Sequence, residues 1–142
     1  SETITVPADT AGEFEFVGDG TGSQTIHTLP AMTFFDLTIN DASASNSDIF
    51  AVPGAGLDVD GSLIVTDGAL DTTDNAADVE TAISLGASGS IDLGASSVNL
   101  AGNWINAGGT LDAGTSTLNL DGTTQSINGD NLLQLCEDFS CC

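Results

Sequence analysis

The sequence predicts an all-β protein, a parallel β-solenoid (β-helix) with about 20 residues per coil. Short segments alternate apolar and polar residues, as strands with one buried face do; Ile91-Asp92-Leu93 and Val98-Asn99-Leu100 are examples. Gly, Asn, Asp and Ser interrupt these segments before a helical stripe can form. Inward positions recur about every seven residues, as at Ile91, Val98 and Ile105, so three strands complete one coil.

A longer period supports the same fold. Leu70 precedes Ile91 by 21 residues, and Ile91 aligns with Leu111 one coil later. Val98 aligns with Leu118 in the same way. A single coil cannot bury its inward side chains, whereas stacked coils place like residues over one another. An antiparallel β-sandwich is the alternative, because alternation and spacing do not fix strand direction.

Strands are expected wherever the alternation recurs between turn residues. In chain order these segments are 1–6, 14–16, 24–26, 34–39, 57–59, 63–65, 83–85, 91–93, 98–100, 111–113 and 118–120. Residues 74–82 are the one segment expected to form a short helical turn. Corner glycines are expected to supply positive φ angles, at Gly86, Gly89, Gly94, Gly102, Gly108, Gly109 and Gly114.

The whole chain, residues 1–142, is expected to form one solenoid domain. Residues 1–13 contain a strand-like stretch that can be exchanged with a neighbouring copy, and residues 136–142 form a Cys-containing tail. The start at Ser1 and the missing initiator Met predict a processed chain from which an export signal has been removed. The expected location is therefore extracellular or at the cell surface.

The charge balance is the most extreme feature of the composition. Asp and Glu total 21, Lys and Arg are absent, and the formal net charge is -21. Such a chain repels nucleic acid and anionic membrane surfaces, and no apolar run of about 18 residues predicts a membrane-inserted helix. The carboxylates either form a solvated surface with no cofactor or bind calcium, for which Asp19, Asp58 and Asp60 are the weak candidates.

The residues on which most catalysis depends are nearly absent. The chain has one His, His27, no Lys, Arg or Tyr, and none of the common nucleophile, zinc-protease or phosphate-loop motifs. A glycosidase-like carboxylate pair, Asp58 with Asp60 or Asp92 with Asp112, is the remaining catalytic interpretation. Outward-facing polar positions on strands explain these residues more simply, so the sequence predicts a protein that is not an enzyme.

Three cysteines lie close together at the end of the sequence. An odd number in an exported protein indicates a bond to another chain, so Cys136, Cys141 and Cys142 are candidates for intermolecular disulfides. Zinc binding is the disfavoured alternative, because the sequence has no Cys-x-x-Cys pair.

The two ends of the sequence resemble each other. Phe14-Glu15-Phe16 followed by Gln24-Thr25-Ile26 is similar to Leu118-Asn119-Leu120 followed by Gln125-Ser126-Ile127. Copies with similar ends can stack head to tail into an open filament. The candidate junction residues are apolar positions near the two ends, namely Ile4, Val6, Phe14, Phe16, Leu133 and Leu135.

Several segments carry a resemblance to a known class of repeats. Thr33-Phe34-Phe35-Asp36-Leu37-Thr38-Ile39 and residues 102–111 look like the repeats of bacterial surface β-helix proteins, similar to hemagglutinin-type adhesins and autotransporter passengers. The resemblance implies a parallel β-helix, export and a role in surface structure or adhesion. We therefore expect a self-polymerising structural subunit of an extracellular filament or surface fibre. The alternative is an adhesin-type or carbohydrate-binding solenoid module with a cell-surface partner.

Overall fold

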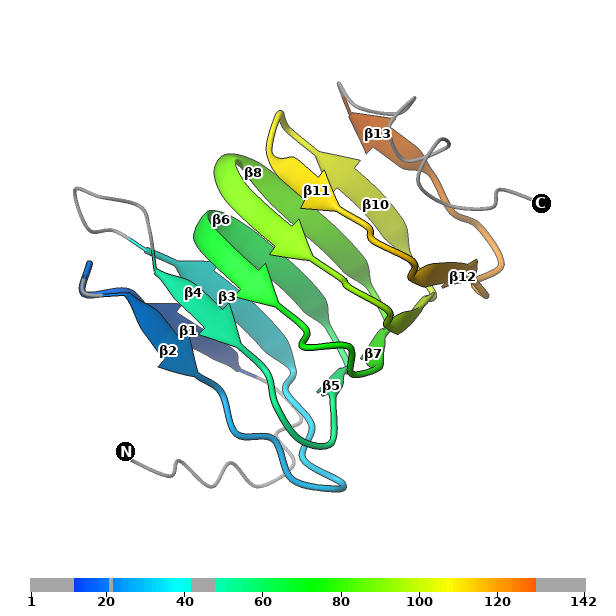
Figure 1. Cartoon of the computed structure of the whole chain (residues 1–142). Helices are drawn as coiled ribbons and strands as arrows, with labels where there is room; N and C mark the ends of the chain where they lie inside the picture. Colours follow the sequence, from blue (N-terminus) through cyan, green and yellow to red (C-terminus); the bar gives the residue numbers. More distant parts are fainter. Residues whose placement is uncertain (1–11, 21, 42–47, 130–142) are drawn as a thin grey trace.

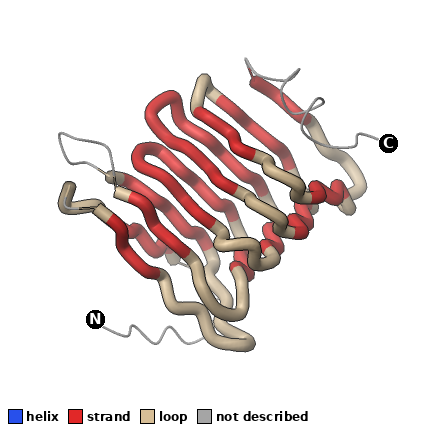
Figure 2. Tube along the Cα trace, viewed as in Figure 1, coloured by secondary structure: helices blue, strands red, loops and turns tan. Residues whose placement is uncertain are grey.

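The computed structural model describes residues 12–20, 22–41 and 48–129. These residues form thirteen short strands and no helix, and they therefore contain no helix that could cross a membrane. The chain winds into a parallel β-solenoid of about 5 turns, with successive turns roughly 21 residues apart (Figures 1 and 2). The predicted fold is confirmed.

Each coil contributes to three faces, which are named here in chain order. The first face carries β1 (Glu13–Val17), β3 (Asp36–Asn40), the starts of β6 (Ser62–Asp71) and β8 (Ala82–Asp92), β10 (Asn103–Asn106) and β13 (Ile127–Gly129). The second face carries β2 (Ser23–Thr25), β4 (Ile49–Ala51), the later parts of β6 and β8, and β11 (Thr110–Asp112). The third face carries β5 (Leu57–Val59), β7 (Ala77–Val79), β9 (Ser97–Leu100) and β12 (Thr117–Leu120).

The strand register matches the long period of the sequence. Leu70 pairs with Ile91, and Ile91 pairs with Leu111, on the second face. Val98 pairs with Leu118 on the third. All of these ladders are parallel, so the antiparallel sandwich is excluded.

The core is a set of apolar columns that run along the solenoid axis. On the first face one column holds Phe14, Leu37, Leu63, Ile83, Trp104 and Ile127. Trp104 is only 2% exposed, whereas Ile105 is 41% exposed. The seven-residue spacing passes through Ile105, but the alternation of the sequence allows either Trp104 or Ile105 to face inward, and the structure buries Trp104. The register pairs Trp104 with Ile83 and Ile105 with the outward Ser84, which fixes the two orientations.

Two local predictions about turns need correction. Residues 74–82 form no helical turn, because a tight turn with positive φ at Thr73 and Asp74 leads directly into β7. Three of the corner glycines, Gly94, Gly108 and Gly114, have the expected positive φ angles. The other four, Gly86, Gly89, Gly102 and Gly109, do not. A Cβ atom at Gly102 would overlap the carbonyl oxygen of Thr81 on the preceding coil, so close packing of coils requires this glycine.

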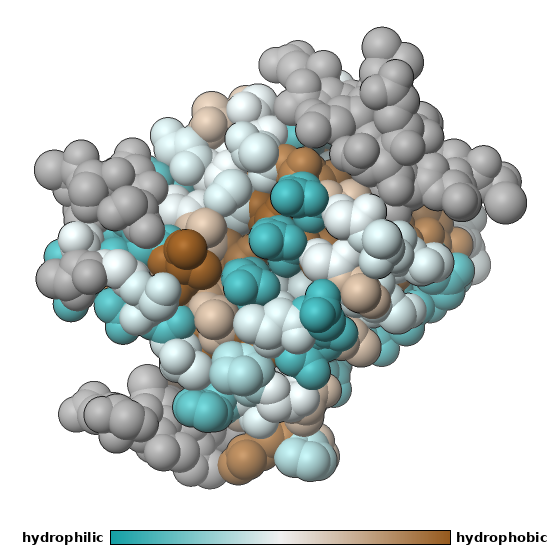
Figure 3. Space-filling model, in the orientation of Figure 1, coloured by the Kyte–Doolittle hydropathy of each residue, from teal (hydrophilic) through white to brown (hydrophobic). Residues whose placement is uncertain are grey.

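Apolar residues at the surface are few and scattered. Figure 3 shows one side of the molecule, on which hydrophilic and neutral residues surround small hydrophobic areas. The most exposed large apolar side chains are Val17, Leu29, Ile49, Ile105 and Leu120. The sides of the described solenoid therefore offer no broad apolar surface for a partner.

Candidate functional site: the two ends of the solenoid

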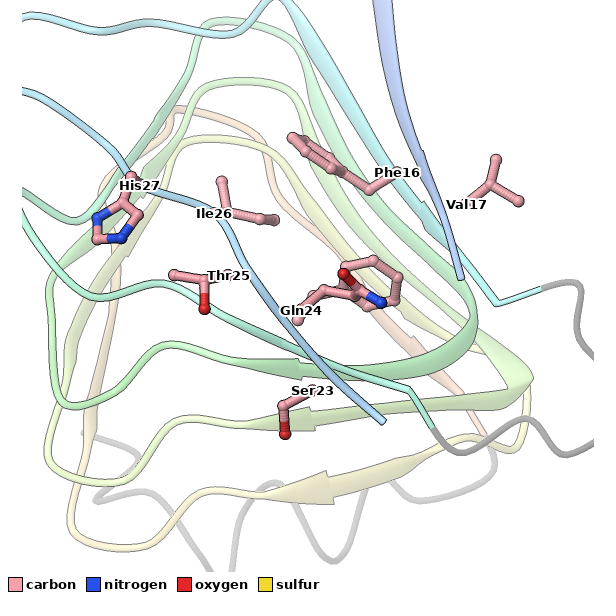
Figure 4. Close-up of a pocket in the computed structure, with 8 residues that line it drawn as sticks. Phe16, Val17, Ser23, Gln24, Thr25, Ile26 and His27 are labelled. Carbon is pink, nitrogen blue, oxygen red and sulfur yellow. The ribbon is translucent and has the colours of Figure 1, made fainter. Parts of the chain in front are cut away.

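The N-terminal end is formed by the edge strands of the first coil. Among the described residues, β1 pairs only with β3, and β2 pairs only with β4. A hollow of about 610 Å³ opens between them, lined by Phe16, Val17, Ser23, Gln24, Thr25, Ile26, His27 and Phe50. Figure 4 looks along the three-sided coil and shows Phe16 and Ile26 within its outline and Val17 pointing away from it.

Aromatic packing supports the first strand. The ring centroids of Phe14 and Phe34 lie 5.8 Å apart, and those of Phe16 and Phe50 lie 6.4 Å apart. Phe14 and Phe16 are partly buried and pack against the core from its outermost coil. The structure therefore places these two junction candidates at the solenoid end. The other candidates, Ile4, Val6, Leu133, Leu135, Cys136, Cys141 and Cys142, lie outside the described residues.

The loop after β1 is held by a buried carboxylate. Asp48 is fully buried and accepts backbone N–H bonds from Asp19 at 2.7 Å, from Gly20 at 2.8 Å and from Gly22 at 2.8 Å. Its own N–H donates to the Asp41 carboxylate at 3.0 Å. The sequence suggested an oxygen-rich calcium loop here, but the amides of this loop face a carboxylate, as in an anion-binding nest. Asp48 was missed because its partners are almost 30 residues away.

The three calcium candidates are not brought together. Asp19 follows β1, and its carboxylate accepts from Gln24 at 3.3 Å. Asp58 lies on β5 of the third face, accepts from Thr33 at 3.1 Å and is followed by the exposed Asp60. Within the described ranges no group of three or more His, Cys, Asp or Glu residues is arranged to hold a metal ion.

Carboxylates are stacked along the outer surface of two faces. On the third face Asp58 pairs with Asp78 across adjacent coils. Partial burial raises the pKa of Asp78, and the negative charges of Asp58 and Asp121 raise this pKa further.

On the second face Asp71, Asp92 and Asp112 form a column beside a shallow hollow of about 260 Å³. Each of these carboxylates accepts a backbone N–H two residues ahead, from Thr73, Gly94 and Gly114 respectively. The Asp92 and Asp112 pair considered for catalysis thus occupies outward strand positions on adjacent coils.

The C-terminal end also finishes in strand edges. In the described part of the chain, β12 pairs only with β9, and β13 pairs only with β10. Leu118 and Ile127 are partly buried against the core, and Leu120 is 39% exposed. Leu118-Asn119-Leu120 lies on the third face, whereas its sequence counterpart Phe14-Glu15-Phe16 lies on the first, so the similar segments are not equivalent positions around the coil.

Among the described residues, two buried hydroxyl groups have no hydrogen-bond partner, and they lie near the same two ends. They belong to Thr28 in the first coil and Ser116 in the fifth, both between the second and third faces. In the middle of the solenoid a buried hydroxyl is satisfied across coils, since the Oγ1 of Thr72 lies 2.6 Å from the Oγ of Ser96. An unpaired buried hydroxyl costs about 1–3 kcal/mol. Hydrogen-bonding capacity is thus left over in the terminal coils.

Comparison of this chain with protein-family models, with curated proteins and with solved structures finds no match.

Proposed function

We propose that this protein is a structural subunit of an extracellular filament or surface fibre and that its copies stack head to tail. The observation that carries the proposal is the presence of open parallel strand edges at both ends of the described solenoid, on β1 and β2 and on β12 and β13. Open edges are templates for pairing with another chain. A contact between two different ends repeats without closing and produces a filament.

Apolar side chains at both ends favour such a contact. Phe14 and Phe16 at one end, and Leu118 and Ile127 at the other, are only partly buried in a single copy. Each would gain cover from a stacked copy, and removing apolar surface from water stabilises association by about 25 cal/mol per Å². The unpaired hydroxyls of Thr28 and Ser116 lie in the same terminal coils and support the same interpretation.

Strand complementation and disulfides complete the proposal. In the part of the chain that the structure describes, the first face has six strands and the third has four, so the first face extends further along the axis than the third. Glu13 belongs to β1 and pairs with Asp36 of its own copy, so the exchanged strand predicted within residues 1–13 has to come from the segment before it. This segment of a neighbouring copy is the proposed occupant of the position beyond β12. Bonds between copies through Cys136, Cys141 and Cys142 would then lock the junction. The resemblance to bacterial surface β-helix repeats belongs with this proposal and supports export to the cell surface.

Electron microscopy of the purified full-length protein tests the proposal, with sedimentation velocity to follow assembly in solution. Samples are compared with and without reductant, calcium and about 0.5 M salt, because screening removes repulsion between chains that each carry a net charge of -21. Uniform filaments support a subunit role, and their dissociation on reduction assigns the cysteines to the junction. Monomers under every condition would refute the proposal.

A second candidate function is an adhesin-type or carbohydrate-binding module. The hollow on the second face favours it, because Asp71, Asp92 and Asp112 lie beside the hydroxyl groups of Ser90 and Thr110. Rows of carboxylates and hydroxyls can hydrogen-bond sugar hydroxyls. A glycan array probed with the wild-type protein and with Asp92→Ala tests this function: it requires binding that the substitution abolishes.

A further inference from the structure

We infer that the outer edge of β1 in one copy pairs in parallel with β13 of a second copy. In this pairing Asn128 of the second copy donates a hydrogen bond to Glu15 of the first. The inference rests on the proposed function, because it specifies the residues and the register of the head-to-tail junction. Its occupant is a second copy of this chain in the same rotational orientation, first face on first face.

Continuity of the first face determines the register. Phe14 begins the inward column that ends at Ile127, and Phe16 begins the column that ends at Gly129. If the ladder continues into a second copy, Ile127 lies opposite Phe14 and Gly129 opposite Phe16. The smallest residue then faces the large Phe16 ring, which borders the open hollow. Side-chain size is therefore complementary across the junction.

The outward position between these two columns belongs to Glu15, and its charge is compatible with this register. The register brings Asn128 opposite Glu15, so a neutral amide meets the carboxylate in a protein whose net charge is -21. The Oε1 of Glu15 already accepts from Asn40 at 2.8 Å, which leaves its second oxygen as an acceptor. Asn128 is exposed on the last strand, and its side chain supplies the donor.

The sequence around the two asparagines is also similar. Thr38-Ile39-Asn40 and Ser126-Ile127-Asn128 are both hydroxyl, isoleucine and amide residues in succession, and both lie on or next to strands of the first face. Asn40 reaches Glu15 diagonally, because Thr38 is the residue paired with Glu15, whereas Asn128 would lie directly opposite. Glu15 would lie between two amide donors, one from its own β3 and one from the neighbouring β13. Hydrogen bonds to a charged carboxylate are stronger than those between neutral groups.

A junction rotated by one face is the competing arrangement. It would place β1 against β12, the pairing suggested by the similarity between Phe14-Glu15-Phe16 and Leu118-Asn119-Leu120. Asn119 would then face Glu15 with one of its two amide N–H groups already donating to the Oδ1 of Asn99 at 3.2 Å, so this contact alone does not separate the two arrangements. The rotated arrangement brings together different faces, so the first-face columns end at the junction.

Disulfide trapping distinguishes the two arrangements. The background protein carries Cys136→Ser, Cys141→Ser and Cys142→Ser, and the test variant adds Glu15→Cys and Asn128→Cys. β1 and β13 lie at opposite ends of one copy, so a disulfide between them joins two copies (Figure 1). Side chains on adjacent strands lie about 5 Å apart, close to disulfide geometry. We expect a ladder of covalent oligomers after mild oxidation, and its collapse on reduction.

Two matched variants serve as controls. Glu15→Cys with Ile105→Cys uses the outward position one coil deeper in the same column, about 4.8 Å further away, and should give at least about tenfold less covalent oligomer. Glu15→Cys with Asn119→Cys reports the rotated junction. A ladder with Asn119→Cys in place of Asn128→Cys, or equal ladders in all three, would overturn the inferred register while the filament function stands. If neither the wild-type protein nor the cysteine-free background forms filaments, both the filament function and the inferred register are refuted.

Discussion

Asp58 and Asp78 occupy paired positions on adjacent coils, so two carboxylates are stacked directly on the outer surface of the third face. Along the same column the next two residues are Asn99 and Asn119. The ladder therefore divides into two halves: Asp58 and Asp78 are neighbouring negative charges, whereas the Nδ2 of Asn119 donates to the Oδ1 of Asn99 at 3.2 Å. This difference makes the column a direct test of how charge affects stability.

Replacing Asp78 by Asn should stabilise the protein at neutral pH. Because the folded-state pKa of Asp78 is raised above 3.8, the folded protein retains its proton more strongly than the unfolded chain does. Stability is therefore lost as pH rises from about 3.8 through the raised pKa, and the loss persists at neutral pH. Thermal unfolding should show Asp78→Asn raising Tm by roughly 1–3 °C at pH 7 and by nothing at pH 3. Asp60→Asn removes the same formal charge and serves as the control; an equal gain there would contradict the stacking explanation.

Asp48 should be essential to the first coil. Replacing it by Ala leaves three backbone N–H groups, those of Asp19, Gly20 and Gly22, without their carboxylate acceptor. We expect a loss of about 2–4 kcal/mol in urea unfolding, because three partly buried N–H groups lose a charged acceptor at once. Asp48→Asn keeps one acceptor oxygen and should lose less. A midpoint unchanged in both variants would contradict the structural role of this carboxylate.

Trp104 and its neighbour Ile105 should respond in opposite ways to truncation. Trp104→Ala empties a core position that is 2% exposed and should cost about 3–5 kcal/mol, whereas Ile105→Ala should change stability by less than about 0.5 kcal/mol. Trp104 is the only Trp, so its fluorescence emission reports burial directly. A blue-shifted maximum that moves to the red on unfolding is expected. Emission at the solvent-exposed wavelength in the native protein would show that the orientation is reversed.

Assembly should depend on the inward side of β1. Phe16→Asp introduces a charge at the apolar end and should shift the concentration needed for half-maximal assembly upward by at least about tenfold. Val17→Asp adds the same charge to the adjacent residue, which is 58% exposed, and should have a much smaller effect. Circular dichroism separates loss of assembly from loss of folding. Equal effects of the two substitutions on assembly would indicate simple charge repulsion.

The regular part of the fold was predictable because its signal is periodic. Leu70, Ile91 and Leu111 recur at the coil length, and a parallel stack is the arrangement that buries all three in one column. Spacing failed at Trp104 and Ile105 because adjacent apolar residues satisfy the alternation in either phase. Only the cross-strand partner, Ile83, decides between them.

The end sites were only partly predictable. Phe14 and Phe16 were identified as apolar positions near one end of the sequence, but their similarity to Leu118 and Leu120 matched segments that lie on different faces. The corner loops vary in length, so similar segments can stand at different angular positions. Asp48 gave no local signal, since a buried acid that binds distant amides is indistinguishable in sequence from a solvated one.

The coil repeat in the middle of the molecule, where the ladder between β6 and β8 has a register shift between Val65 and Asp67, has a consequence for how such a protein can vary in size. Ser62 pairs with Ala82, so residues 62–81 make up one complete repeating unit whose two edges match each other. Duplicating this segment would lengthen the rod by one strand spacing, about 4.8 Å, and leave both terminal coils as they are. The length of the rod can therefore change in steps of one coil, while the end surfaces through which copies would bind one another stay the same.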